Sequence, residues 1–234
     1  MATTYSLREL YGGAVAVELP TEFIDSNDIR QIPDHQEVFL SPTTLTSIIF
    51  ELNDYVHPQP LRAATQQPQP QPQQNGTSST SPQTAVDVDV EAAKYHFTDV
   101  ISPPDNLASP LPASERTAMH AASLSGFPTL VLAGNIHSVD KSRSSRPSAA
   151  ASSSSTTISS SLQQQQSIVH QLQLLIRMKN YATDLCVRVN VPMKELAQRG
   201  GGEVAAEVAH AKELLDRVVA SLDVRDFGLF GAAA

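Results

Sequence analysis

Hydrophobic and polar positions alternate most clearly in residues 47–52, which read Ser-Ile-Ile-Phe-Glu-Leu. Successive side chains of a strand point to opposite faces of a sheet, so Ile48, Phe50 and Leu52 share one face. Glu51 then lies on the opposite face, away from the main apolar stripe. The alternation predicts a strand here with an exposed Glu51.

Other short apolar runs predict further strands. They are residues 14–19, closed by a proline, residues 37–40, residues 129–133, and the pair 171–179 and 183–191. The last two flank a short polar turn, which indicates an antiparallel hairpin. In the second strand of this hairpin Leu185, Val187, Val189 and Val191 share one face, which leaves Cys186, Arg188 and Asn190 on the other.

One helix is predicted near the C-terminal end of the chain, over residues 203–222. Apolar side chains recur there at steps of three and four, at Val204, Val208, Ala211, Leu215, Val218 and Leu222. Such a stripe packs on a sheet. Antiparallel strands covered by a few helices predict an α+β fold, with a central antiparallel sheet flanked by helices.

Two segments carry too few apolar residues for a core. Residues 57–90 are rich in proline and glutamine, and residues 138–161 are mostly serine. Both compositions are typical of disordered insertions. Without them roughly 176 of the 234 residues remain, a usual size for one domain. We therefore predict a single domain over residues 1–234 with two insertions.

Charge is concentrated at the N-terminal end of the chain. Nine acids stand against two bases before Pro58, while the whole chain has a formal charge of -8. An acidic pole attracts basic surfaces and repels nucleic acid and anionic membranes. We expect a basic protein partner, no nucleic acid and no membrane.

Sequence motifs for catalysis and cofactor binding give no consistent set. Residues 226–228 read Asp-Phe-Gly, but the other protein-kinase motifs are absent, and the histidines lack metal-ligand spacing. Cys186 lies inside a predicted strand, where an inert thiol is expected. The N-terminus lacks the layout of a signal peptide. These patterns predict an intracellular protein that is not an enzyme and needs no cofactor or metal.

Short sequence blocks carry a family resemblance through their order and spacing. They are residues 10–14 (LYGGA), 19–20 (LP), 23–25 (FID), 30–34 (RQIPD), 36–39 (QEVF), 47–49 (SII), 93–99 (AKYHFTD), 130–134 (LVLAG), 174–177 (LLIR), 183–185 (TDL), 189–192 (VNVP) and 229–231 (LFG). Together they resemble the Ran guanine nucleotide release factor family. Its members are small nuclear import factors that bind the GTPase Ran.

The resemblance implies a fold and a site. The fold is a central antiparallel sheet in α/β/α layers, which also occurs in PsbP-like photosynthetic proteins. The residues on the family's Ran-binding face are Asp25, Arg30, Pro33, Asp34, Gln36 and Glu37, together with the acidic pair Glu51 and Asp54. The family commonly reads Glu-Leu-Leu-Glu at residues 51–54. Asp54 therefore keeps the negative charge of the family's second glutamate on a side chain that is one methylene shorter.

The implied mechanism is release of guanine nucleotide from Ran. Glu51 and Asp54 would act electrostatically on the cations that hold the nucleotide, and Asp25, Asp34 and Glu37 would steer and dock the partner. Arg30 would form a salt bridge to the partner or an internal clamp on Asp34. The resemblance further implies a monomer in the nucleus and cytoplasm, with other Ran effectors as further partners.

Two alternatives remain open at this point. The chain could be a PsbP-like accessory subunit of a photosynthetic complex, which would call for a targeting segment. It could also be a small-molecule enzyme that uses its carboxylates as acid and base, which would require two of them in a deep pocket with pKa values pushed apart.

Overall fold

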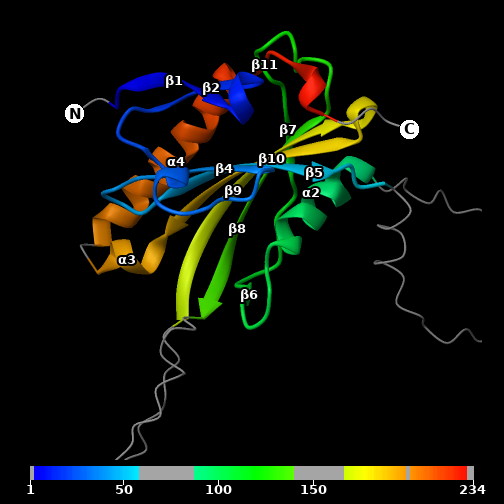
Figure 1. Cartoon of the computed structure of the whole chain (residues 1–234). Helices are drawn as coiled ribbons and strands as arrows, with labels where there is room; N and C mark the ends of the chain where they lie inside the picture. The colour runs from blue at the N-terminus through cyan, green and yellow to red at the C-terminus, as the bar shows by residue number, and fades with distance from the viewer. Residues whose placement is uncertain (1–2, 58–86, 140–165, 199–200, 231–234) are drawn as a thin grey trace, which may run out of the picture.

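The computed structural model describes residues 3–57, 87–139, 166–198 and 201–230 (Figure 1). Most of the two predicted insertions therefore lies outside the described residues. Within the described part, the strands form two antiparallel sheets. The smaller has the order β1-β2-β11, with β1 at Tyr5–Leu10, β2 at Val15–Pro20 and β11 at Asp223–Val224.

The larger sheet has the order β3-β4-β5-β10-β9-β8-β6, and β7 also pairs with β8. Its strands are β3 (Ile24–Asp25), β4 (Gln36–Leu40), β5 (Ser47–Asp54), β6 (Asn106–Leu107), β7 (Glu115–Thr117), β8 (Thr129–Val139), β9 (Gln166–Met178) and β10 (Thr183–Pro192). The predicted hairpin is confirmed as β9 and β10, joined through the 3-10 turn η4 (Lys179–Tyr181). The strands predicted around β2, β4, β5 and β8 are confirmed as well.

Helices cover both faces of the larger sheet (Figure 1). Helix α4 (Gly201–Ser221) packs against β9 and β10 on one face and against β2 of the smaller sheet. Helix α2 (Val88–Asp99) packs against β8 and β9 on the opposite face, and the short α3 (Met193–Ala197) contacts α4 and β9. The predicted α+β fold with helices flanking a central antiparallel sheet is confirmed.

The alternation in β10 separates two apolar clusters. Leu185, Val187 and Val189 belong to the main core with Leu214 and Val218 of α4. Cys186 is also fully buried, in a second cluster that includes Ala92 and Ala93 of α2. Both faces of the sheet are therefore buried along this strand, which explains why seven consecutive residues of β10 are buried, from Thr183 through Val189.

Helix α2 begins inside the range predicted as a disordered insertion. Asp87 caps the helix, because its side chain accepts hydrogen bonds from the backbone N–H groups of Asp89 and Val90. Val88 and Val90 pack beside the second cluster. The upper boundary at residue 90 is therefore wrong, and so is the lower boundary of the other insertion, because residues 138–139 belong to β8.

Gly134 in β8 packs too tightly for a larger residue. A Cβ atom there would lie 2.8 Å from Leu111 Cδ2 and 2.9 Å from Cζ of the fully buried Phe97. We expect Gly134→Ala to lower the free energy of unfolding by about 1–3 kcal/mol, as overpacked sites do. Urea denaturation measures the change. Gly126→Ala is the control, because its Cβ would meet no atom within 4 Å. Equal stability of both variants would contradict this packing.

Candidate functional site

Glu51 is buried, and the prediction that it is exposed is wrong. Only 8% of the residue is accessible, and its carboxylate forms an ion pair with Arg188 of β10. The same carboxylate accepts hydrogen bonds from Gln36 Nε2 at 2.5 Å and from Asn53 Nδ2 at 3.2 Å. The sheet face away from the main core is covered by α2, whose His96 carbonyl accepts a further hydrogen bond from Arg188.

This environment keeps Glu51 charged. Burial alone would raise the pKa of its carboxyl, but the charge and hydrogen bond of Arg188, with the hydrogen bonds from Gln36 and Asn53, lower the pKa below its usual value. The carboxylate is therefore fully engaged inside the protein. Its geometry suits holding β4, β5 and β10 in place, not direct contact with a partner.

Asp25 and Glu37 stabilise the turn that follows β3. Asp25 accepts a hydrogen bond from the backbone N–H of Asn27 at 2.8 Å, at the start of the 3-10 turn η2 (Ser26–Asp28). Glu37 accepts from the backbone N–H of Tyr11 at 2.8 Å and from Asn27 Nδ2 at 3.2 Å. These two acids therefore connect the β1–β2 turn, η2 and β4.

The remaining residues of the signature segment are exposed. Arg30, Pro33 and Asp34 all lie at the surface. Among the described residues, Arg30 and Asp34 form no ion pair with each other or with other side chains. The proposed internal clamp between them is therefore wrong, and both charges point into solvent.

The pairing of β4 with β5 separates two of the predicted acids, Glu37 and Glu51. Gln36 lies opposite Glu51, and Glu37 lies opposite Phe50, whose side chain belongs to the main core. Side chains directly opposite each other share a face. Glu37 and Glu51 therefore occupy opposite faces of the sheet, and the predicted residues do not form one continuous cluster.

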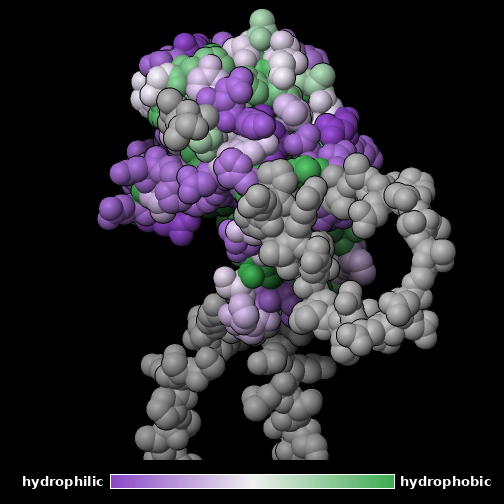
Figure 2. Space-filling model, turned by 90° about the vertical axis from the view of Figure 1, so that its right-hand side faces the viewer, coloured by the Kyte–Doolittle hydropathy of each residue, from purple (hydrophilic) through white to green (hydrophobic). Residues whose placement is uncertain are grey.

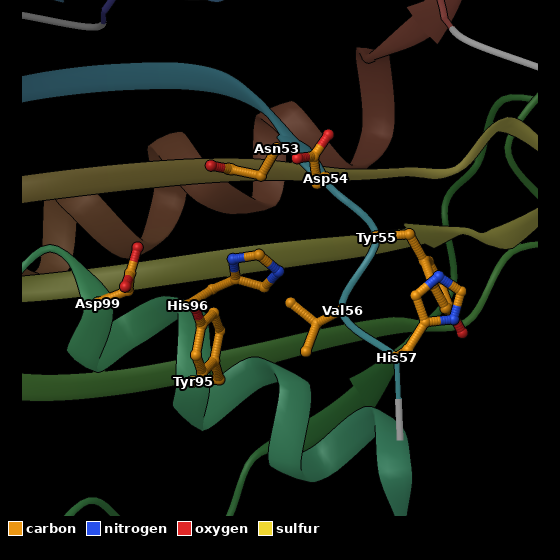
Figure 3. Close-up of a pocket in the computed structure, with 8 residues that line it drawn as sticks. All are labelled: Asn53, Asp54, Tyr55, Val56, His57, Tyr95, His96 and Asp99. Atoms are coloured by element: carbon orange, nitrogen blue, oxygen red, sulfur yellow. The ribbon is translucent and has the colours of Figure 1, made fainter. Parts of the chain in front are cut away.

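Asp54 is exposed at the end of β5, beside a pocket of about 310 Å³ (Figure 3). The pocket is lined by Asn53, Asp54, Tyr55, Val56, His57, Tyr95, His96 and Asp99. Three of these residues come from α2, which the strand and helix patterns did not predict. The AKYHFTD block at residues 93–99 was the sequence signal that could have found them.

A buried ionic network lies beneath this pocket. The Oδ2 atom of Asp184 accepts hydrogen bonds from His96 Nε2 at 2.8 Å, Arg177 Nη1 at 2.9 Å and the backbone N–H of Val56 at 3.0 Å. Arg177 also donates to the Val56 carbonyl at 2.9 Å, and its guanidinium lies 4.0 Å from the centre of the Tyr55 ring. The network therefore ties the segment after β5 to the sheet and to α2.

His96 carries a positive charge in this network at neutral pH. Burial alone would lower the pKa of its imidazole, but hydrogen bonds to Asp184 and Cys186 outweigh burial and raise the pKa to about 9. His96, Asp184 and Arg177 are each at most 3% exposed. None of the three was predicted as a site residue: Arg177 and Asp184 face each other across the predicted hairpin, but His96 joins them from 88 positions away in the sequence.

Large hydrophobic side chains are exposed at a few described positions. Among the described residues, the exposed large hydrophobic side chains are Leu7, Ile24, Ile29, Leu45, Tyr95 and Val100. Figure 2 shows hydrophobic residues in small, separate areas of a largely hydrophilic face. In the described part of the chain no helix is long and apolar enough to cross a membrane. Recognition at this surface would therefore depend on charge and on single apolar contacts.

The geometry gives little support to acid–base catalysis. Glu51 is held by Arg188, and the two carboxylates that line the pocket, Asp54 and Asp99, are both exposed. A catalytic acid and base need distinct environments that push their pKa values apart. The residues described here also contain no group of histidine, cysteine and carboxylate side chains that could hold a metal ion.

The known proteins that this chain resembles are Ran-interacting proteins. The model of the family described as "Ran-interacting Mog1 protein" matches residues 8–192. The Ran guanine nucleotide release factor of Bos taurus is 27% identical over 224 residues, which cover 95% of each chain. A probable Ran guanine nucleotide release factor of Dictyostelium discoideum is 46% identical over 55 residues, 24% of this chain and 28% of that protein.

A solved structure shows the same fold. The crystal structure of the Saccharomyces cerevisiae Ran-binding protein Mog1p aligns with a TM-score of 0.52 and 20% identity, and the alignment covers 98% of this chain and 100% of that one. The matched family region includes every residue of the signature segment, the acidic pair and the pocket. The chain therefore belongs to the Mog1 family of Ran-interacting proteins.

Proposed function

We propose that this protein binds the small GTPase Ran and promotes release of its guanine nucleotide, in support of nuclear protein import. The observation that carries the proposal is the family match over residues 8–192. It is supported by the near full-length similarity to the Ran guanine nucleotide release factor of Bos taurus, and by shorter matches to nuclear import proteins of two yeasts.

The charges at the surface suit this function. Asp34 and Asp54 are exposed and form no ion pair or side-chain hydrogen bond within the described chain. They remain available for basic groups of a partner. A small GTPase holds its nucleotide through a phosphate-binding loop, a lysine and Mg²⁺. A protein that binds the nucleotide-free state more tightly shifts the equilibrium toward release, and no covalent step is required.

The structure supports a division of roles among the site residues. Asp54 contacts Ran directly, with Arg30, Pro33 and Asp34 at the exposed turn before β4. Asp25 and Glu37 hold the preceding turn η2 by accepting hydrogen bonds from Asn27, and Glu37 also accepts one from Tyr11. Gln36 and Glu51 act from inside, because their hydrogen bond joins β4 to β5. This assigns Glu51 a positioning role in place of direct contact.

We place the protein in the nucleus and the cytoplasm, where a factor that supports import would meet Ran. It acts as a monomer, without a cofactor and without enzymatic chemistry of its own. Other Ran effectors are proposed as additional partners through Ran.

A charge reversal at Asp54 tests the function. We expect Asp54→Lys to slow release of fluorescent GDP from Ran at least about tenfold, because like charges at a binding surface cost several kcal/mol. Stability should change by only about 0.5 kcal/mol, as for other exposed positions.

The control for this variant is Glu213→Lys. Glu213 lies on α4, and its side chain is 75% exposed. This control should leave release at the parent rate. Parent activity in Asp54→Lys would show that Asp54 takes no part in binding Ran, and no release by the parent protein would overturn the proposed function.

A further inference from the structure

Helix α2 is held to the sheet largely by polar contacts. Its buried residues, which offer little large apolar surface, are Ala92, Ala93, His96 and Phe97. Gln173 of β9 donates through Nε2 to the Ala93 carbonyl at 2.8 Å, and Arg188 of β10 donates through Nη2 to the His96 carbonyl at 3.1 Å. The His96 carbonyl is among the last four of the helix, which lack partners inside it. Buried hydrogen bonds therefore provide much of the attachment of α2.

His96 connects α2 to two buried ion pairs. Its imidazole Nε2 lies 2.8 Å from Asp184 Oδ2, and the same carboxylate pairs with Arg177 at 2.9 Å. The backbone carbonyl of His96 accepts from Arg188, which forms the ion pair with Glu51. A change of charge at His96 therefore affects both ion pairs.

The same network fastens the segment that follows β5. Val56 donates its backbone N–H to Asp184 at 3.0 Å, and its carbonyl accepts from Arg177 at 2.9 Å. Figure 3 shows the side chains of Val56 and His96 pointing toward each other. Arg177 Nε also lies 3.3 Å from Asp89 in the first turn of α2. This segment and both ends of α2 thus share one set of buried charges.

The charges beneath α2 balance only while His96 is protonated. The cations are then His96, Arg177 and Arg188, and the anions are Asp89, Asp184 and Glu51. The other titratable groups near the imidazole are the Cys186 thiol, which forms a hydrogen bond with it, and the pocket residues Asp54, Tyr55, His57, Tyr95 and Asp99. Loss of the His96 proton leaves three carboxylates against two cations. An uncompensated charge in a buried site is destabilising.

We infer that α2 and the segment after β5 open together while the rest of the fold stays intact, and that the proton on His96 holds them closed. Local opening of this kind occurs in elements with few buried apolar contacts. The main core lies on the opposite face of the sheet, against α4, and remains packed. Opening uncovers Cys186, which is buried beside Ala92 and Ala93. The inference goes beyond the proposed function and does not depend on it.

The open fraction should rise with pH. The pKa of His96 is about 9 in the closed protein and about 6.5 when water surrounds the imidazole. The closed state therefore binds the proton more tightly, and this preference is complete below about pH 6.5 and is lost as the pH rises through 9. Between these values the open fraction should increase by up to about tenfold per pH unit.

Labelling of Cys186 measures the opening, because it is the only cysteine of the chain. The rate of reaction with the thiol reagent DTNB is divided by the rate for the chain unfolded in urea at the same pH. This ratio gives the open fraction and removes the pH dependence of the thiol itself. We expect it to rise roughly 10–40-fold from pH 6.5 to pH 8.5. A ratio that does not change with pH would overturn the inference.

The matched control moves the cysteine by one position. Cys186→Ala combined with Val187→Cys places the thiol on the opposite face of β10, in the main core, where only global unfolding uncovers it. Its open fraction should equal the unfolded fraction of the same variant, measured by urea denaturation. For Cys186 in the parent, the open fraction at pH 8.5 should exceed the unfolded fraction at least about tenfold. If the two fractions agree for Cys186 as well, α2 does not open separately and the inference is wrong.

A neutral side chain at position 96 tests the role of the proton. The glutamine of His96→Gln still offers a donor to Asp184 but carries no charge. Cys186 should then be labelled at least about tenfold faster than in the parent at pH 6.5, with little change up to pH 8.5. His120→Gln, at an exposed position, should keep the parent profile. Parent rates and a parent pH profile in His96→Gln would overturn the inference. If His96→Gln does not fold, the pH series of the parent and the displaced cysteine still decide the question.

Discussion

Glu51→Lys is expected to lower the free energy of unfolding by about 3–5 kcal/mol, as breaking a buried ion pair does. Glu51 is 8% exposed and pairs with Arg188, which is 4% exposed. The new lysine would place a second positive charge beside Arg188 in the same buried site. Gln36 and Asn53 would also lose the oxygen atoms to which they donate. Guanidinium denaturation followed by circular dichroism measures the loss.

The neighbouring acid provides the control. Asp54 is three positions further along β5 but is exposed, so Asp54→Lys should keep nearly the parent stability. Replacing the whole pair with apolar residues, as in Glu51→Leu combined with Arg188→Met, should recover most of the lost stability, because no unpaired charge remains. If Glu51→Lys were as stable as Asp54→Lys, the burial of this carboxylate would be disproved.

Loss of Ran binding in Glu51→Lys would therefore not identify Glu51 as a contact. A variant that is partly unfolded at the assay temperature loses all of its binding surfaces, whichever residues form them. The informative comparison is the apolar double variant, in which the fold is kept while both charges are absent. Binding by this double variant would support a positioning role for Glu51.

The strands were predictable because their side-chain pattern is local. In β5 and β10 the alternating residues Ile48, Phe50, Val187 and Val189 fill the main core, as the period of two requires. Helix α4 was predictable for the same reason, since its apolar stripe recurs at three- and four-residue steps. Sequence patterns of this kind reveal which face of an element is most apolar.

Helix α2 was missed because its buried face is weakly apolar. Its buried residues are Ala92, Ala93, His96 and Phe97, so the stripe combines small, polar and aromatic side chains. The valines and aspartates of residues 86–90, at the start of the helix, alternate and do not show a helical period. The cap at Asp87 and the acidic first turn were the local signals for this helix.

The burial of Glu51 could not be predicted from the sequence of β5 alone. The alternation correctly placed Glu51 opposite the main core, but an opposite face is exposed only when nothing covers it. Arg188 comes from β10 and Gln36 from β4, and the carbonyl that orients Arg188 belongs to α2. The position of the acid therefore depended on three segments that lie far apart in the sequence.

The second large effect is expected for Asp184→Asn, which should also lower the free energy of unfolding by about 3–5 kcal/mol at neutral pH. Asp184 is fully buried and accepts hydrogen bonds from His96, Arg177 and the backbone of Val56. An asparagine side chain has no charge to offset those of His96 and Arg177. The segment after β5 would lose its attachment at the same time.

The pH dependence of stability distinguishes the ionic network of His96, Asp184 and Arg177 from simple apolar packing. The pKa of His96 is raised to about 9 in the folded protein, against about 6.5 in an unfolded chain. The folded state therefore binds the proton more tightly, and this contribution to stability is complete below about pH 6.5. It decreases as the pH rises toward 9, by up to about 1.4 kcal/mol per pH unit.

Asp184→Asn should remove this decrease in stability as the pH rises toward 9. Without the Asp184 carboxylate, the hydrogen bond that contributes most to raising the pKa of His96 is lost, and burial then lowers that pKa from its parent value. The stability difference between parent and variant should then be large at pH 6 and shrink toward pH 9. Denaturation at pH 6.0, 7.5 and 9.0 measures it, with His120→Asn at an exposed position as the control that keeps the parent profile. A difference that stays constant across this range would show that His96 and Asp184 do not share a proton-dependent ion pair.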